Sequence, residues 1–139
     1  MEKTIRFSVS ISPDLLKKFD KEIKARAYTN RSRAVRDLIV NFIVEREWER
    51  SETEVMGSLT LLYDHETRGL LKKLIEIQHE RHENIASTMH LHIDEHMCME
   101  ILALKGMPKE IRELADRLIS CRGVKHGKLV MSTTGKEIT

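Results

Sequence analysis

The 139-residue chain contains few cysteines, few aromatic side chains and no long apolar run. Its two cysteines, Cys98 and Cys121, make a poor disulfide framework, so we expect a reduced protein of the cytoplasm. No apolar run approaches the roughly 20 residues that span a bilayer, and no apolar segment of a signal peptide follows the first residues. The sequence also lacks a glycine-rich phosphate loop and a nucleophile motif. The missing apolar run leads us to expect no membrane partner, and the missing catalytic motifs weigh against an enzyme.

Positive charge is concentrated at the start of the chain. Residues 1–36 contain ten Lys and Arg against four Asp and Glu, a net charge of +6, whereas the whole chain carries +2. The remaining residues therefore sum to about −4. A basic segment joined to an acidic one suggests a polyanion partner for the first segment alone, although a solvated basic face would have the same composition.

Residues 1–47 predict a strand followed by two amphipathic helices. In "IRFSVSI" (5–11), apolar side chains alternate with the polar Arg6, Ser8 and Ser10, which is the period of a strand. Two helical stripes follow, the first capped at Ser12 and the second at about Asn30. A segment of this size cannot bury its own apolar surface, so we expect two copies to pair their strands as an antiparallel ribbon.

The paired ribbon would fit the major groove of double-stranded DNA. Arg reads guanine bidentately and Ser reads either partner, so Arg6, Ser8 and Ser10 are the predicted base contacts. The second helix begins at three polar residues, Asn30, Arg31 and Ser32. Free backbone N–H groups at such a helix start suit a phosphate. An ordinary edge strand with outward polar residues is the alternative.

Residues 57–135 predict a second domain after a polar linker at 48–56. The pattern reads as strands 57–64, 85–94, 96–106 and 126–133 with helices 65–83 and 108–121. This βαββαβ order is ferredoxin-like and makes the chain α+β. In helix 65–83 we expect four residues to face the core: Leu70, Leu71, Leu74 and Ile75. In strand 85–94 we expect Met89, Leu91 and Ile93 to do so.

The stretch "MHLHIDEHMC" (89–98) concentrates side chains that bind metals. His90 and His92 share one strand face, roughly 6.5–7 Å apart, and Cys98 can approach them from the next antiparallel strand. Glu100 lies on the same face as Cys98 and could hold a ligand imidazole by a hydrogen bond. Two imidazoles and a thiolate suit Zn, Ni, Cu or Co. Water, His79 or His82 could supply a fourth ligand.

These residues carry a family resemblance. The first segment resembles ribbon-helix-helix DNA-binding domains. About residues 4–135 resemble the nickel-responsive transcriptional regulators of the NikR family, most specifically in "QHERHENIASTMHLHIDEHMCMEILALKG" (78–106) and "RGVKHGKL" (122–129). The resemblance implies that the βαββαβ domain is ACT-like and that the protein is a homotetramer, a dimer of dimers. It also implies an operator with two-fold half-sites and, for the function, repression of nickel uptake.

The resemblance also implies a ligand set for one Ni(II) per chain. His90, His92 and Cys98 match three ligands, His79 matches a histidine from another subunit, and Glu100 matches the supporting carboxylate. Some family members have an acidic pair that helps hold a potassium-type cation between the domains. Asp37 matches one member of that pair, but Arg33 stands at the other, so we expect its guanidinium to take part of that role or the interdomain site to be weaker.

Two rival interpretations stay open. In the first, a regulator of the same shape binds a small metabolite and the histidines are incidental. In the second, the metal belongs to a zinc-dependent hydrolase with Glu95 or Glu100 as its base. Substitution of His90 or Cys98 by alanine would distinguish these two interpretations from the nickel interpretation, because only the nickel interpretation predicts loss of metal-dependent DNA binding.

Overall fold

The computed structural model describes residues 3–138 and divides the chain into two compact units, Met1–Val40 and Asn41–Thr139. The division falls inside helix α2 (Arg31–Arg50), after Val40. No helix within the described residues is both long and apolar enough to cross a membrane.

The first unit contains α1 (Pro13–Ala25) and the start of α2. Ser12 caps α1 as predicted, because its Oγ accepts the backbone N–H of Leu15 at 3.3 Å. Residues 3–12 form no strand within the single chain, since a β-ladder needs a second strand. Their apolar side chains are left exposed: Ile5 85%, Phe7 65%, Val9 67% and Ile11 43%.

Helix α2 is longer than the sequence pattern predicts. Its start agrees, because Oδ1 of Asn30 accepts the backbone N–H of Arg33 at 2.9 Å. Its end does not, because the helix continues to Arg50 and the next strand begins at Val55, so only residues 51–54 of the predicted linker 48–56 lie outside regular structure. Trp48 explains the extension: it is 2% exposed, and its Nε1 donates to the backbone oxygen of Ser132 at 2.8 Å.

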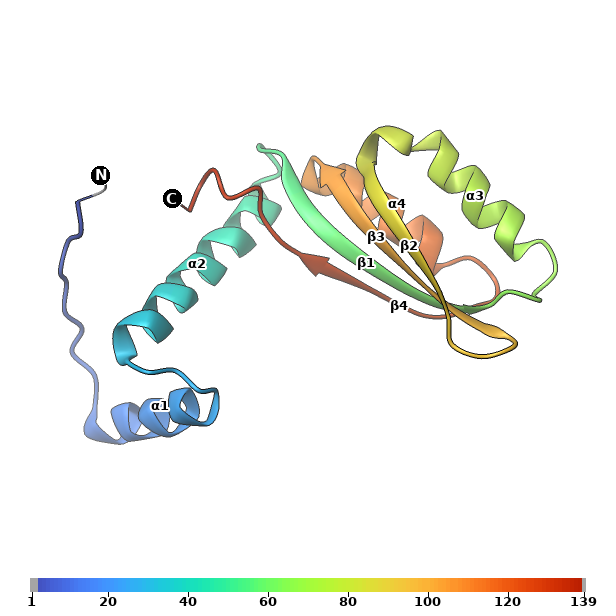
Figure 1. Cartoon of the computed structure of the whole chain (residues 1–139). Helices are drawn as coiled ribbons and strands as arrows, with labels where there is room; N and C mark the ends of the chain where they lie inside the picture. Colours follow the sequence, from blue (N-terminus) through green and yellow to red (C-terminus); the bar gives the residue numbers. More distant parts are fainter. Residues whose placement is uncertain (1–2, 139) are drawn as a thin grey trace. The chain divides into compact units, whose positions relative to one another are not determined.

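The second unit has the predicted ferredoxin-like order. Its antiparallel sheet runs β2-β3-β1-β4, with β1 (Val55–Asp64), β2 (Ile85–His92), β3 (Met97–Gly106) and β4 (Val124–Met131). Helix α3 (Leu70–Glu80) follows β1, a short 3-10 turn η1 (His82–Asn84) precedes β2, and α4 (Pro108–Ile119) joins β3 to β4 (Figure 1). Strand β2 is an edge strand.

Helices α3 and α4 cover one face of this sheet. Alternate residues of β1 and β3 pack with them into one core: Val55, Leu59, Leu61, Tyr63, Cys98, Leu102 and Leu104. From α3 the core receives Leu70, Leu74 and Ile77. The predicted stripe was therefore wrong at Leu71 and Ile75, which are 39% and 65% exposed. Helix α3 begins at Leu70 rather than residue 65, and positions 70, 74 and 77 form its inner face.

The predicted assignment of faces in β2 was also wrong. His92 pairs with Cys98 and His90 with Glu100, so both histidines lie on the face that the helices cover. Met89, Leu91 and Ile93 lie on the uncovered face and are 57%, 41% and 53% exposed. Alternation shows which residues share a face, but not which face the helices cover.

Candidate functional site

Strands β2 and β3 bring three predicted ligands together at the edge of the sheet. One atom each from His90, His92 and Cys98 lies within 4.8 Å of the others. The antiparallel register produces this cluster, because His92 stands opposite Cys98 and His90 comes two residues earlier on the same face. Cys98 is fully buried, whereas the two histidines are exposed. The cluster therefore has a buried sulfur and an open side.

Cys98 holds its proton in the metal-free protein. Burial raises the pKa of the thiol, and the nearby carboxylates of Asp64, Asp94 and Glu100 raise it further. The Sγ atom lies 3.5 Å from Nδ1 of His92, within hydrogen-bond distance for sulfur. A bound metal cation would displace the proton and be attracted by the same carboxylates.

A buried carboxylate, Glu100, is linked to His90 through the hydroxyl of Tyr63. Glu100 is 8% exposed, and its two oxygens accept hydrogen bonds from the Tyr63 hydroxyl at 3.1 Å and from Nε2 of Gln78 at 3.0 Å. The Tyr63 oxygen also lies 3.4 Å from Nδ1 of His90. Because the hydroxyl donates to Glu100, its oxygen can accept a hydrogen bond from a protonated Nδ1 of His90. That tautomer leaves Nε2 of His90 with a lone pair for a metal.

Glu100, which we expected to hold a ligand imidazole directly, bonds instead to Tyr63 and Gln78, two residues that the sequence pattern did not indicate. Burial raises the pKa of Tyr63, and the Glu100 charge raises it further, so the phenol stays a donor across the physiological range. The sequence offered only indirect signals for the roles of Tyr63 and Gln78. Tyr63 stands opposite Cys98 in the β1–β3 register, and Gln78 directly precedes His79 on α3.

His79 does not join the cluster within its own chain. Among the described residues, the group that could hold a metal here consists of His90, His92 and Cys98 alone. His79 is exposed at the last turn of α3, and Nδ1 of His82 lies 3.1 Å from the His79 backbone oxygen. One chain therefore brings together two histidines and a cysteine, and it presents His79 on its surface at a different place.

The donor set fits a borderline or soft transition metal. Imidazole nitrogen and thiolate sulfur bind Zn, Ni, Cu and Co, whereas Mg and Ca prefer oxygen. A second group, Asp64, Glu66 and His96, also brings its ligand atoms within 4.8 Å of one another. It is rich in oxygen and open to solvent, and Oε2 of Glu66 already lies 3.0 Å from Nδ1 of His96.

The predicted DNA-contacting residues are accessible in the first unit. Arg6, Ser8 and Ser10 are exposed. At the start of α2 the three predicted residues differ in their surroundings. Asn30 caps the helix, Ser32 is exposed, and Arg31 forms a bidentate pair with Asp20 at 2.8 Å. Arg31 is therefore already held by a carboxylate within this chain.

Asp37, the residue predicted for a cation site, has partners for both carboxylate oxygens. Oδ2 accepts the Tyr28 hydroxyl at 2.7 Å, and Oδ1 lies 3.3 Å from Nε of Arg33. Nη1 of Arg36 lies 3.7 Å from the same Oδ1. The Asp37 carboxylate raises the pKa of Tyr28, chiefly through their hydrogen bond.

These features define a class of protein: a basic, alternating segment and two helices, followed by a βαββαβ domain with a His/Cys cluster that could hold a metal. Comparison with known families agrees. Residues 5–46 match the family described as ribbon-helix-helix protein, copG family, and residues 56–132 match the NikR C terminal nickel binding domain. The chain belongs to the NikR family of nickel-responsive regulators, which are regulators and not enzymes.

Curated relatives that bear the name "Putative nickel-responsive regulator" match nearly the whole chain. One from Caldanaerobacter subterraneus subsp. tengcongensis is 51% identical over 138 residues, which cover 99% of this chain and 90% of the relative. One from Thermococcus kodakarensis is 51% identical over 136 residues, which cover 98% of this chain and 99% of the relative. The solved structure of uncharacterized protein TM1266 from Thermotoga maritima shares the fold, with a TM-score of 0.52 and 22% identity over 57% of this chain and 98% of that one.

Proposed function

We propose that this chain is a cytoplasmic, nickel-dependent DNA-binding regulator that represses nickel uptake as a homotetramer. Its family membership supports the coarse function. The observation that carries the proposal is the cluster of His90, His92 and Cys98 in a chain whose first segment is basic.

The proposed site holds one Ni(II) per chain between two copies. His90, His92 and Cys98 come from one copy and His79 from a second. Two observations support a ligand from outside: the three-ligand cluster is open on one side, and His79 is exposed away from its own cluster. His79 also shares the outer stripe of α3 with the exposed Leu71 and Ile75, at spacings of four residues, which suits contact with another protein surface.

Two separate apolar surfaces support a dimer of dimers. The first is the exposed apolar side of residues 5–11, which would be covered when two copies pair as a ribbon. The second is the uncovered face of the sheet, where Met89, Leu91, Ile93 and Val130 are exposed. Monomeric proteins seldom expose such apolar groups together. Two different self-complementary surfaces on one chain close into a tetramer when their two-fold axes cross at right angles.

The proposed DNA contacts lie in the first unit. Arg6, Ser8 and Ser10 of two copies would read bases in the major groove, and Asn30, Arg31 and Ser32 would face phosphates. A dimer reads a two-fold site, and a tetramer with two such dimers reads two half-sites at once, gaining avidity when their spacing fits. By linkage, if nickel favours the DNA-competent arrangement, then DNA must tighten nickel binding by the same factor.

The Arg33 guanidinium takes the place of a cation beside Asp37 in this proposal. Support comes from the Asp37 carboxylate, both of whose oxygens are already engaged by Tyr28 and Arg33. A crystal structure of the DNA complex grown in potassium buffer tests this point. An ordered potassium ion coordinated by Asp37 would contradict it.

A nickel titration tests the metal site. Ni(II) added to the metal-free protein should produce a thiolate-to-metal charge-transfer band with a planar d8 spectrum, saturating at one ion per chain, and His79→Ala should alter it. A featureless or tetrahedral spectrum that His79→Ala leaves unchanged would contradict the planar nickel site and favour the alternative in which the domain binds a small metabolite. Selection of duplexes from a random pool with and without Ni(II) then tests DNA binding, with Arg6→Ala as the control.

A further inference from the structure

We infer that a partly buried group of polar side chains around Asn84 positions His79 for the nickel site of a second copy. The group, which we call the Asn84 knot, consists of Arg81, Asn84 and Glu110. This inference rests on the proposed function, because it concerns His79 as a shared ligand.

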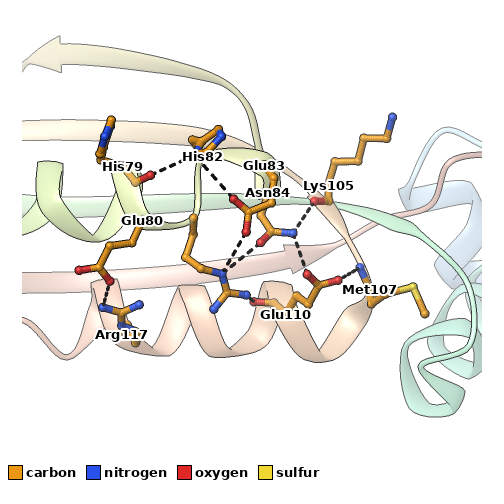
Figure 2. Close-up of polar contacts among 10 residues, drawn as sticks. His79, Glu80, His82, Glu83, Asn84, Lys105, Met107, Glu110 and Arg117 are labelled. Carbon is orange, nitrogen blue, oxygen red and sulfur yellow. Dashed lines mark hydrogen bonds and ion pairs between the residues drawn. The ribbon is translucent and has the colours of Figure 1, made fainter.

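Asn84 is at the centre of the knot and is 2% exposed. Its Nδ2 donates to the backbone oxygen of Lys105 at 3.1 Å and approaches Oε2 of Glu110 at 3.5 Å, and its Oδ1 accepts from Nε of Arg81 at 3.2 Å (Figure 2). Gly106 makes room for this amide, since a Cβ there would collide with it. The side chain is therefore held on both its donor and acceptor sides.

The knot ties the end of α3 to two other elements. Nη2 of Arg81 donates to the backbone oxygen of Glu110 at 3.2 Å, and Oε1 of Glu110 accepts the backbone N–H of Met107 at 3.1 Å. Glu110 lies in the first turn of α4, and Lys105 lies near the end of β3. The chain leaving α3 is thus fixed against a strand and a helix by partly buried hydrogen bonds, which water competes for poorly.

His79 lies immediately before the segment that the knot fixes. Arg81 is the C-cap residue of α3, and the 3-10 turn His82–Asn84 follows it. Nδ1 of His82 lies 3.1 Å from the backbone oxygen of His79, so a proton on Nδ1 adds a second restraint on the same backbone (Figure 2). The His79 ring itself is exposed. Its position for another copy is therefore set through its main chain, and the knot sets that main chain.

A neighbouring exposed contact provides a matched control. Oε2 of Glu80 accepts from Nη2 of Arg117 at 2.8 Å, with side chains 60% and 42% exposed. This pair also joins the end of α3 to α4, but exposed ion pairs contribute little. If burial is what makes the knot effective, Glu80→Gln should leave nickel binding unchanged.

The test uses nickel titration of the full-length chain in four variants: Asn84→Ala, Arg81→Gln, Glu80→Gln and His79→Ala. We expect Asn84→Ala and Arg81→Gln to weaken nickel binding about 10- to 100-fold, the range for residues that orient metal ligands. Their spectra should resemble that of His79→Ala. Millimolar imidazole, added as a free fourth ligand, should restore the planar spectrum in all three, because the remaining ligands stay in place. Arg81→Gln decides the matter if Asn84→Ala does not fold.

Three results would overturn the inference. A folded knot variant with wild-type nickel affinity would show that His79 does not depend on the knot. A spectrum lost in the knot variants but not restored by imidazole would show damage to the domain as a whole rather than displacement of one ligand. A wild-type spectrum in His79→Ala would refute the shared ligand on which the inference rests.

Discussion

Replacing Tyr63 by Phe tests how the buried carboxylate supports the metal ligands. The change removes one oxygen, which donates to Glu100 at 3.1 Å and lies 3.4 Å from Nδ1 of His90. Glu100 is 8% exposed and would keep Gln78 as its one hydrogen-bond partner among residues 3–138. The aromatic ring, which is fully buried, would stay in place. The variant therefore separates the hydrogen bond from the packing.

Two magnitudes follow from this geometry. A hydrogen bond to a charged group contributes about 1.5–3 kcal/mol, so the free energy of unfolding of the metal-free protein should fall by about 2 kcal/mol, roughly a 30-fold change in the unfolding equilibrium. Nickel affinity should fall about 10- to 100-fold, because His90 loses the group that fixes its tautomer. Both effects should occur without a change in fold.

Urea denaturation measures the first effect with an intrinsic probe. Trp48 is the only tryptophan, and it is buried in the second unit, so its fluorescence reports the unfolding of that unit. The midpoint should fall while the slope with urea stays constant, at matched protein concentration because association shifts the equilibrium. Tyr28→Phe is the control. It removes a hydroxyl that donates to Asp37 in the first unit, so this substitution should leave nickel affinity unchanged. Wild-type stability and nickel affinity in Tyr63→Phe would refute the assigned role of this hydroxyl.

Three further predictions use independent measurements. Burial raises the pKa of the Cys98 thiol, so nickel must displace its proton to bind the sulfur. Nickel affinity, measured by competition with a chelator, should therefore rise about tenfold per pH unit near neutrality. A nickel affinity that does not change with pH would contradict the thiolate ligand. Gly127→Ala would place a Cβ against the Ile119 side chain, so thermal unfolding should show a loss of about 1–3 kcal/mol, and an unchanged midpoint would mean that α4 shifts freely. Arg6→Ala should weaken binding to selected duplexes in a gel-shift assay while the nickel spectrum stays intact, and unchanged sequence preference would remove Arg6 from the base contacts.

The order of elements in the second unit was predictable because its signals are local. Period-2 strands and the Pro108 start of α4 need only neighbouring residues. The cluster of His90, His92 and Cys98 was predictable for a related reason: a short antiparallel hairpin places residues of known register on one face. The helix-covered face of β2 was not, because it depends on where α3 and α4 pack.

Other features depend on contacts between distant parts of the sequence. Trp48 stands in a polar stretch, and its hydrogen-bond partner Ser132 lies at the other end of the chain, so the stretch read as a linker. Tyr63 has an ordinary core position on β1, and its hydroxyl becomes functional only because β3 places Glu100 beside it. Such roles follow from the assembled sheet rather than from any local pattern.

Mixing two variants tests most directly whether nickel is held between copies. His79→Ala and His90→Ala each remove one ligand from every site, so neither alone should give the full nickel spectrum. After subunit exchange, a site on a His79→Ala chain can receive His79 from a His90→Ala chain, and random mixing should restore about a quarter of the sites. If no spectrum returns although exchange is verified by mass spectrometry, His79 does not cross between copies, and the shared-site account fails.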